Sequence, residues 1–394
     1  MRRMLTRRRF ISVAAAGAAV FKLPRLSAAE HDLLIKGGRV IDPSRRFDQA
    51  ADVAIKGGKI AAVQPNIAAS TAAESIDATG KLVVPGLIDI HTHAGREKED
   101  AALCLADGVT SLVDAGSAGA DGIDAVVAIA KAAPTRMRVL INAGKKGIIP
   151  EGDLMDLANV DVAAMRAGIE RHRDVVVGIK ARLSKPVAGK NDLEALKRAQ
   201  SVARPLGVPI MIHMGQTESA LPDILAVLKS GDIVTHMYAP PPNGIFDGSG
   251  KLLAAVADAR KRGIWFDVGN GLNKHITWDV ADRATKGGFW PDTISTDWVP
   301  TGRADQIFNF GTVLSKFLLL GMPLARVIAC ATANAAKAMP TFRGLGTLAP
   351  GAIADVVVME LQRGSFEFVD NEHTSRKGTE KLQTVKVVKG GKSL

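Results

Sequence analysis

Eight short apolar runs, separated by longer stretches with helical spacing, limit the folds open to this chain more than any other feature. The runs are rich in aliphatic and β-branched residues, and intervening stretches such as NDLEALKRAQSVARPLG end in glycine, a helix stop. Such alternation is typical of βα units around a parallel sheet, and eight units close a barrel. The sequence therefore predicts an α/β fold, a (β/α)8 TIM barrel, with strands in residues 87–93, 108–116, 137–144, 175–182, 208–215, 232–240, 263–270 and 292–298.

The two ends of the chain carry a different pattern. DLLIKGGRVID, ADVAIKGGKIAAVQ and GKLVVPG near the start, and GTLAPGAIADVVVMEL, SFEFVD and LQTVKVVKGGK near the end, are short strand-like segments with turn signals. We expect both ends to complete one small flanking β-sandwich. Its two parts are residues 30–84 and 343–394, and the barrel occupies residues 85–342.

The first 29 residues have the form of an export signal. A basic segment precedes an apolar, alanine-rich stretch and a small-residue site near Ser27, which predicts a signal peptide. The arginines before Phe10 and Ile11 resemble a twin-arginine signal, used for proteins exported folded. The expected location is periplasmic or secreted, with the export machinery as a partner. A retained N-terminal anchor and a fortuitous basic tail are the alternatives, although the apolar stretch is too short to span a bilayer.

The net charge of +11 arises mostly from that same segment. Seven of the 51 Lys and Arg lie in residues 1–29, and the remaining 44 against 40 Asp and Glu leave a balance of only +4. With one Tyr and no basic-aromatic interleaving, the mature chain shows no nucleic-acid footprint, and no stable membrane anchor is expected. Cys104 and Cys330 are interpreted as buried thiols rather than a disulfide. The sequence does not decide the oligomeric state, and a homo-oligomer is one alternative.

Polar residues stand at the ends of five of the apolar runs, where the chemistry of such barrels is found. His91 and His93 are two apart on a strand, so both point to one face, as a pair of metal ligands would. Lys180 ends a buried run, and an unpaired buried ammonium is costly, so it must be exposed at the strand end, paired or chemically changed. The full set of candidate metal ligands is His91, His93, Lys180, His213, His236 and Asp297.

The other four histidines are expected at the surface or in loops, and only one of them has a candidate role. His275 follows the seventh run and could approach a substrate. The remaining three are His31, His172 and His373.

These residues carry a resemblance to a known family. VVPGLIDIHTHAG resembles the opening motif of the amidohydrolase superfamily, and GTLAPGAIADVVV is similar to the return of such chains into the flanking sandwich. Within it the chain resembles the amidohydrolase/deacetylase group, related to dihydroorotases and hydantoinases. The resemblance implies a (β/α)8 barrel with two divalent metal ions, where His91, His93 and Asp297 bind one metal and His213 and His236 bind the other. It further implies that Lys180 bridges them as a carbamate.

A mechanism follows from that implied assembly. A mixed nitrogen and oxygen set suits zinc, with manganese, iron or cobalt as alternatives. Two metals would supply a hydroxide near neutral pH and polarise the substrate carbonyl. Asp297 would act as general acid and base. The alternative for Asp297 is a helix N-cap after the strand.

Substrate contacts are less constrained by the sequence. Arg182 shares a strand face with Lys180 and could clamp a carboxylate, with a salt bridge to a nearby loop as the equal alternative. Tyr238 shares its face with His236 by the same parity. Relatives tend to carry a histidine near the position of Asn270, and this departure affects any transfer of their substrates. The remaining candidates lie in strand-end loops: Asn142, Ser117 and Asn243.

The expected function is an exported, binuclear metal-dependent hydrolase of amide or ester bonds, and a deacylase or deacetylase of small carboxylate-bearing compounds such as N-acyl amino acids. A cyclic amidase of the dihydroorotase or hydantoinase type is the nearest alternative. A non-catalytic metal-binding scaffold is the alternative from another class, and its sequence mark would be a missing ligand. None of the six is missing.

Overall fold

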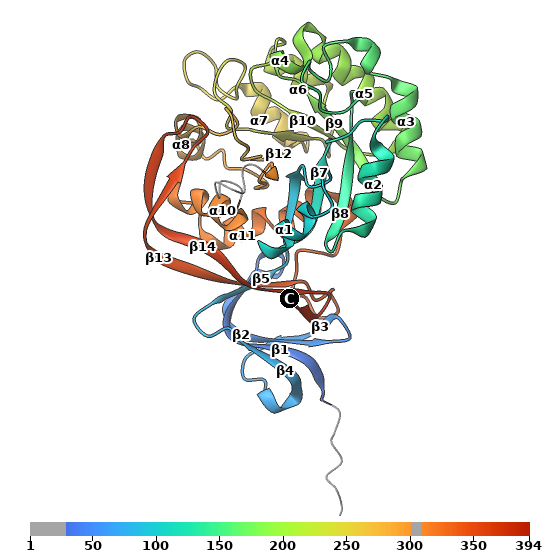
Figure 1. Cartoon of the computed structure of the whole chain (residues 1–394). Coiled ribbons are helices and arrows are strands. Elements are labelled where there is room, and N and C mark those ends of the chain that lie inside the picture. Colours follow the sequence, from blue (N-terminus) through green and yellow to red (C-terminus); the bar gives the residue numbers. More distant parts are fainter. Residues whose placement is uncertain (1–28, 301–308) are drawn as a thin grey trace, which may run out of the picture.

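A computed structural model describes residues 29–300 and 309–394. The predicted signal peptide therefore lies outside the described residues, apart from Ala29. Two sheets organise this part of the chain, a parallel sheet surrounded by helices and a mixed sheet built from both chain ends (Figure 1). In the described residues no helix has the length and apolar character needed to cross a membrane.

The parallel sheet forms a TIM-barrel-like wall, and its strands coincide with seven of the eight predicted runs. Neighbouring strands pair in parallel in the order of the sequence, from the first to the last. The strands are β6 (Leu87–Thr92), β7 (Val109–Ala115), β8 (Arg136–Asn142), β9 (Val176–Arg182), β10 (Ile210–His213), β11 (Ile233–Thr235) and β12 (Trp265–Phe266).

The eighth run, residues 292–298, is not a regular strand. It makes isolated parallel bridges to both ends of the sheet, at Asp267–Thr293 and at Thr92–Trp298. The Asp297 amide donates to the carbonyl of His91 at 2.7 Å, and Asp297 itself has a φ of 54°. This segment thus lies between β12 and β6 but leaves extended geometry where it presents Asp297.

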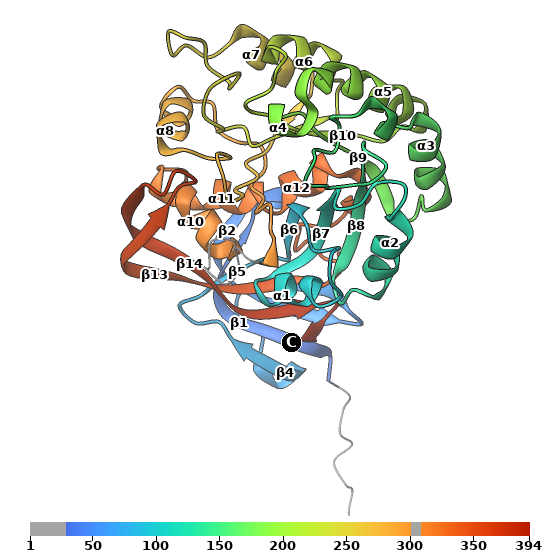
Figure 2. The same ribbon diagram turned by 45° about the horizontal axis from the view of Figure 1, so that its top comes forward.

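Helices follow most of the strands and cover the outside of the wall, as Figure 2 shows for α2, α3 and α5. The predicted glycine stops are used: α5 ends at Gly207, which has a φ of 65°. The helices are α1 (Asp100–Ala106), α2 (Ile123–Ala132), α3 (Val162–Arg171), α4 (Lys185–Ala188), α5 (Asp192–Leu206), α6 (Leu221–Val227), α7 (Ala254–Lys261), α8 (Trp278–Lys286), α10 (Phe310–Leu319), α11 (Leu324–Cys330) and α12 (Ala333–Ala338). Short 3-10 turns are η1 (Pro43–Arg45), η2 (Ala69–Thr71), η3 (Leu157–Asn159), η4 (Gly189–Asn191) and η5 (Pro340–Phe342).

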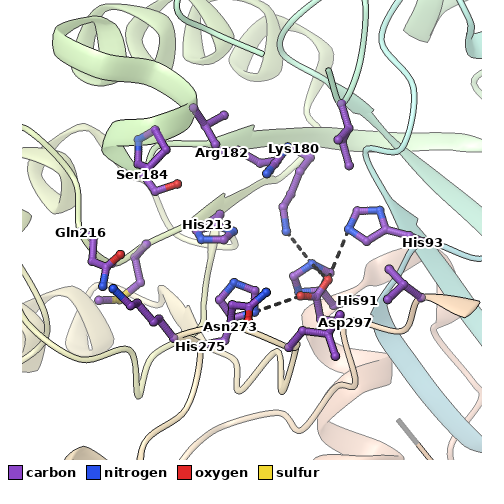
Figure 3. Close-up of a pocket in the computed structure, with 18 of the residues that line it drawn as sticks. His91, His93, Lys180, Arg182, Ser184, His213, Gln216, Asn273, His275 and Asp297 are labelled. Carbon is purple, nitrogen blue, oxygen red and sulfur yellow. Dashed lines mark hydrogen bonds and ion pairs between the residues drawn. The ribbon is translucent and has the colours of Figure 1, made fainter. Parts of the chain in front are cut away.

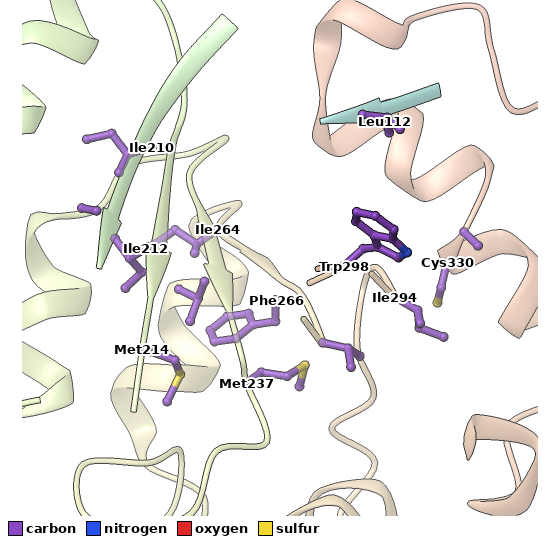
Figure 4. Close-up of a cluster of buried hydrophobic side chains, with 14 of the residues drawn as sticks. Leu112, Ile210, Ile212, Met214, Met237, Ile264, Phe266, Ile294, Trp298 and Cys330 are labelled. Carbon is purple, nitrogen blue, oxygen red and sulfur yellow. The ribbon is translucent and has the colours of Figure 1, made fainter. Parts of the chain in front are cut away.

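Alternate residues of the parallel strands belong to different apolar clusters. Leu112 and Ile212 pack in the large core that includes the covering helices, part of which appears in Figure 4. Val113 and Met211 instead pack with Phe342 of η5 and residues of α12. This separation follows from the period-two alternation of side chains along a strand, and it gives the wall two buried faces.

The terminal sheet joins the two ends of the chain, as predicted. Its order is β15-β14-β13-β5-β1-β2-β3, with β4 beside β1, and Val357 of β13 pairs antiparallel with Val84 of β5. That this sheet folds over as a sandwich stays a prediction, as do the domain boundaries. The strands are β1 (His31–Asp42), β2 (Phe47–Lys56), β3 (Lys59–Gln64), β4 (Ala72–Asp77), β5 (Leu82–Pro85), β13 (Val356–Val369), β14 (Ser375–Lys389) and β15 (Lys392–Ser393).

The hairpin of β13 and β14 extends beyond this sheet. In Figure 1 it rises along α10 to α8 on the side of the barrel-like wall. Its tip, at Asp370 and Asn371, contacts the loop that follows β12.

Candidate metal centre and active site

The six predicted ligands converge at the C-terminal end of the parallel sheet. Figure 3 labels five of them: His91, His93, Lys180, His213 and Asp297. Lys180 Nζ lies 2.8 Å from His91 Nε2, and His91 Nε2 lies 3.2 Å from Asp297 Oδ1. His93 Nε2 contacts the same carboxylate oxygen at 3.3 Å. On the other side of the cluster, the ring centroids of His213 and His236 are 4.2 Å apart. The geometry thus brings the six together, and their role as ligands stays a prediction.

A seventh polar side chain, which the strand-end pattern missed, completes the cluster. The ring of His275 stacks on His236 at 3.8 Å between centroids, and its Nδ1 lies 3.2 Å from Asp297 Oδ2. His275 lies in the loop between β12 and α8, five residues beyond the predicted run. Its expected approach to the site was based on loop position alone, because no spacing signal marks it.

The cluster contains two groups of potential metal-binding atoms within 4.8 Å of one another. One group is His91, His236 and Asp297, and the other is His213, His236 and His275. His236 belongs to both groups. Its Nδ1 lies 2.7 Å from the carbonyl oxygen of Gly269, while its buried Nε2 has no hydrogen-bond partner. A buried nitrogen without a partner is unusual, and a metal ion would satisfy it, so the donor set fits divalent metals.

Hydroxyl relays orient two of the imidazoles. His91 Nδ1 lies 2.9 Å from Thr235 Oγ1, which donates to the buried Asp267. His93 Nδ1 lies 2.9 Å from Ser117 Oγ, which donates to Asp114. Both relays leave Nε2 facing the cluster, and such second contacts fix ring orientation in metal sites.

Burial sets the protonation of the cluster. It lowers the pKa of His91 to about 3, with a further contribution from the charge of Lys180. Burial, and then the charge of His275, also holds the pKa values of His213 and His236 well below 6.5. These imidazoles are therefore neutral near pH 7, the form that binds metals.

The pKa values of Asp297 and Lys180 are both lowered at this site. Burial raises the pKa of Asp297, but charge interactions and hydrogen bonds with His91, His275 and His93 outweigh it and hold the pKa well below 3.8. Burial lowers the pKa of Lys180 to about 7. The site therefore holds an ionised carboxylate and an amine that is partly neutral near pH 7.

A cavity of about 400 Å³ opens above the cluster. Its wall carries the cations Arg96, Arg182 and Lys274, and Asp297 is the one acid among the described lining residues. Arg182 Nη1 lies 3.2 Å from both oxygens of Asp153, so the salt bridge considered as its alternative role is present. Arg182 nevertheless lines the cavity, which is electropositive above its floor.

Of the six predicted substrate contacts, five do not line this cavity. Tyr238 is fully buried, and its hydroxyl donates to the carbonyl of Phe289. The parity argument fails because β11 ends at Thr235 and His236 has a φ of 64°, so strand alternation does not continue to Tyr238.

The side chains of Asn142 and Asn270 form hydrogen bonds with other parts of the protein, away from the cavity. Asn142 donates to Gly116 and Asp153 and accepts from the Gly144 amide. The side-chain oxygen of Asn270 accepts from Lys316 Nζ at 2.8 Å. Both are buried and hold loops in place, which corrects their expected substrate contacts.

Of the two further loop residues, Ser117 orients His93 and lines a neighbouring cavity. Asn243 donates to the carbonyl of Thr217.

Sequence comparison decides the family. The model of the family described as "Amidohydrolase family" matches residues 82–394. The chain belongs to the amidohydrolase family. A deacetylase of Enterococcus faecalis is 30% identical over 371 residues, which cover 92% of this chain and 98% of that protein. The amidohydrolase is thus a hydrolase acting on carbon–nitrogen bonds, in a family that generally uses divalent metals.

Solved structures agree with this assignment. An adenine deaminase superposes with a TM-score of 0.84 at 30% identity, over 92% of this chain and 99% of the other. A dihydroorotase superposes with a TM-score of 0.81 at 25% identity, over 92% and 97% of the two chains. The resemblance inferred from VVPGLIDIHTHAG is confirmed at the level of the family.

Proposed function

We propose that this amidohydrolase is a binuclear deacetylase that removes small acyl groups from carboxylate-bearing compounds such as N-acyl amino acids. The observation that carries the proposal is the cationic wall of Arg96, Arg182 and Lys274 above a floor that holds the ionised carboxylate of Asp297 and the neutral imidazoles of His91 and His213. Such a wall favours anionic substrates. The likeness to a deacetylase over nearly its whole length supports the reaction type.

The metals of the proposal are zinc ions. His91, His93 and Asp297 would hold one ion and His213 and His236 the other, with Lys180 shared as a carbamate. When bound, divalent metals supply a hydroxide from water near neutral pH and polarise the scissile carbonyl.

Asp297 is the proposed proton carrier. Its carboxylate is ionised because its pKa lies well below 3.8, and it lines the cavity where the substrate would lie. It accepts the proton of the attacking water and delivers it to the leaving nitrogen. Arg182 holds the substrate carboxylate, with Asp153 keeping the guanidinium in place.

The carbamate is proposed from the surroundings of Lys180. This residue is 1% exposed and lies against the neutral ring of His91, where an ammonium is poorly solvated. A neutral amine adds carbon dioxide through a new N–C bond and loses one proton. The product offers anionic oxygen to the metals instead of a positive charge.

Metal analysis of protein purified with bicarbonate tests the centre. We expect about two metals per chain, as the two-metal template requires. Lys180→Ala should lose metal and activity, and short carboxylic acids should restore part of both. Lys185→Ala, an exposed lysine paired with Glu218, serves as the control. Full metal content and activity in Lys180→Ala would contradict the bridging role.

A substrate panel tests the reaction. It contains N-acetyl amino acids, acetylated hydroxy acids, dipeptides, cyclic ureides and adenine. We expect turnover of acetylated carboxylates, and Arg182→Met should raise KM by about 10-fold or more with a smaller change in kcat, because it removes a charged contact of about 1.5–3 kcal/mol. Turnover confined to cyclic ureides would favour the cyclic amidase, and turnover confined to adenine would favour a deaminase.

Export to the periplasm is proposed from residues 1–29 alone. Replacing Arg7, Arg8 and Arg9 with lysine keeps the charge but removes the arginine signal. Retention of that variant in the cytoplasm, with export of the wild-type chain, would support a twin-arginine route. Equal export of both would contradict it.

A further inference from the structure

The loop that carries His275 is held by the far end of the chain. Asn371, at the tip of the β13–β14 hairpin, accepts from the amides of His275 and Ile276 through its side-chain oxygen, at 3.1 and 2.9 Å. Its side-chain nitrogen donates to the carbonyl of Gly271 at 2.9 Å. One buried amide therefore fixes both sides of this loop.

Neighbouring contacts make the same junction rigid. Asp370 accepts from the amide of Trp278, the first residue of α8, at 2.9 Å. The indole nitrogen of Trp278 in turn donates to the carbonyl of Thr374 at 2.8 Å. The loop between β12 and α8 is thus held by hydrogen bonds to the tip of the β13–β14 hairpin.

His275 faces the part of the site where ligands are few. In the ligand set implied by the family resemblance, two imidazoles among the described residues, those of His213 and His236, bind the second metal. His275 lies 4.9 Å from His213 and 3.8 Å from His236 between ring centroids, and all three offer nitrogens within 4.8 Å of one another. His236, whose buried Nε2 has no hydrogen-bond partner, belongs to this group.

We propose that His275 is a third imidazole ligand on the His213–His236 side of the metal centre, and that Asn371 is the residue that positions it. The inference rests on the proposed function only in taking a divalent metal to bind there. Three imidazoles are a known protein ligand set for zinc, so His275 would add a third nitrogen to this side, beside the oxygen of the proposed Lys180 carbamate. It follows that metal binding depends on a hairpin that begins in the terminal sheet.

The backbone at Gly271 leaves room for the imidazole of His275. Gly271 has a φ of 54°, and a Cβ there would collide with the His275 ring and approach Asp297 Oδ2 to 2.7 Å. A residue with a side chain would displace the imidazole.

Metal affinity, measured apart from catalysis, tests the proposal. Zinc dissociation constants are obtained by chelator competition for wild type, His275→Ala, Asn371→Ala and Asn371→Asp. We expect a loss of affinity of about 100-fold or more for His275→Ala, and of about 10- to 100-fold for Asn371→Ala, the range found for outer contacts of metal ligands. Asn371→Asp keeps the oxygen that accepts from the loop amides and should recover part of the loss.

Cobalt substitution adds a spectroscopic measurement. Loss of an imidazole ligand changes the visible absorption of bound cobalt(II), so His275→Ala should have a spectrum different from that of wild type. His373→Asn and Glu372→Ala alter exposed side chains in the same hairpin tip, and both should match wild type in affinity and spectrum.

The outcomes separate this inference from the proposed function. Unchanged zinc affinity and an unchanged cobalt spectrum in His275→Ala would overturn the ligand role, whatever the deacetylase assays show. Loss of affinity in His275→Ala without any deacetylase turnover in wild type would leave the ligand role standing and remove the proposed substrate. Loss of affinity in the two control variants equal to that in Asn371→Ala would overturn the positioning role.

Discussion

At the scale of single residues, hydroxyl groups decide how the imidazoles face the site. Thr235 links His91 to the buried Asp267, and Ser117 links His93 to Asp114. Each relay holds Nδ1 and so presents Nε2 to Asp297. The site is built by these outer contacts as much as by its candidate ligands.

Removing one relay should weaken metal binding without removing a ligand. Thr235→Val deletes the hydroxyl but keeps a β-branched side chain of similar size. We expect a loss of metal affinity of about 10- to 100-fold by chelator competition. Thr235→Ser keeps the hydroxyl and is the control. Equal affinity in the valine variant and wild type would show that packing alone orients His91.

Sequence reasoning located side chains well on the strands and poorly beyond them. His91 and Lys180 lie on regular strands, where the position of a residue predicts its direction. Tyr238 and Asn270 lie past strand ends, and the positive φ of His236 breaks the alternation on which the Tyr238 argument depended. His275 reaches the site through loop contacts with Asn371, a residue about 100 positions away, which no local pattern could reveal.

At the scale of elements, the loop between β12 and α8 has the strictest backbone requirement at the site. Gly271 adopts a φ of 54° beside His275 and Asp297. By contrast, Gly207 adopts a φ of 65° at the end of α5, and a Cβ added there would point into open space. The two glycines share a conformation but differ in surroundings.

Alanine substitutions at these two glycines distinguish the effect of backbone strain from the effect of displacing His275. Gly271→Ala and Gly207→Ala should each lose about 1 kcal/mol or more of the free energy of unfolding, because alanine disfavours a left-handed backbone. Only Gly271→Ala should also lose metal affinity and activity, by at least about 10-fold, since it displaces His275. Unfolding and chelator titrations measure the two effects. Equal activity in both variants would show that the loop relaxes around the methyl group.

Helix α10 introduces a titratable group beneath the same loop. Lys316 is 2% exposed, donates to Asn270, and has its pKa lowered by burial from 10.5 to about 8. Between these pH values an unfolded lysine keeps a proton that the folded one has lost. The unfolded state therefore binds more protons, and the free energy of unfolding rises with pH across this window.

The pH dependence is measurable by substitution. Relative to Lys316→Met, wild-type protein stripped of metal should gain stability from about pH 8 to 10.5, by up to about 1.4 kcal/mol per pH unit. Denaturant unfolding at several pH values gives the difference between the two proteins. A difference that stays constant with pH would mean that Lys316 keeps its proton when buried.

At the scale of the whole molecule, the chain ends are part of the catalytic unit. Strand β13 pairs with β5, which directly precedes β6, the strand that contains His91 and is followed by His93. The same hairpin reaches the His275 loop at its tip. The pairing of both ends could be predicted because each carries strand and turn signals. The extension of the hairpin to the site could not, because it depends on contacts made by Asp370 and Asn371 across the fold.

Metal removal tests whether this arrangement behaves as one unit. The candidate ligands come from the ends of β6, β9, β10 and β11, from the segment after β12 and from the eighth run, so a bound ion connects most of the wall. A ligand that binds only the folded state adds about 4 kcal/mol when its free concentration is 1,000 times its dissociation constant. We expect zinc to raise the unfolding temperature of chelated wild-type protein and to have little effect on Lys180→Ala. An equal shift in both proteins would place the stabilising ion elsewhere, since a centre that needs Lys180 cannot form in the variant.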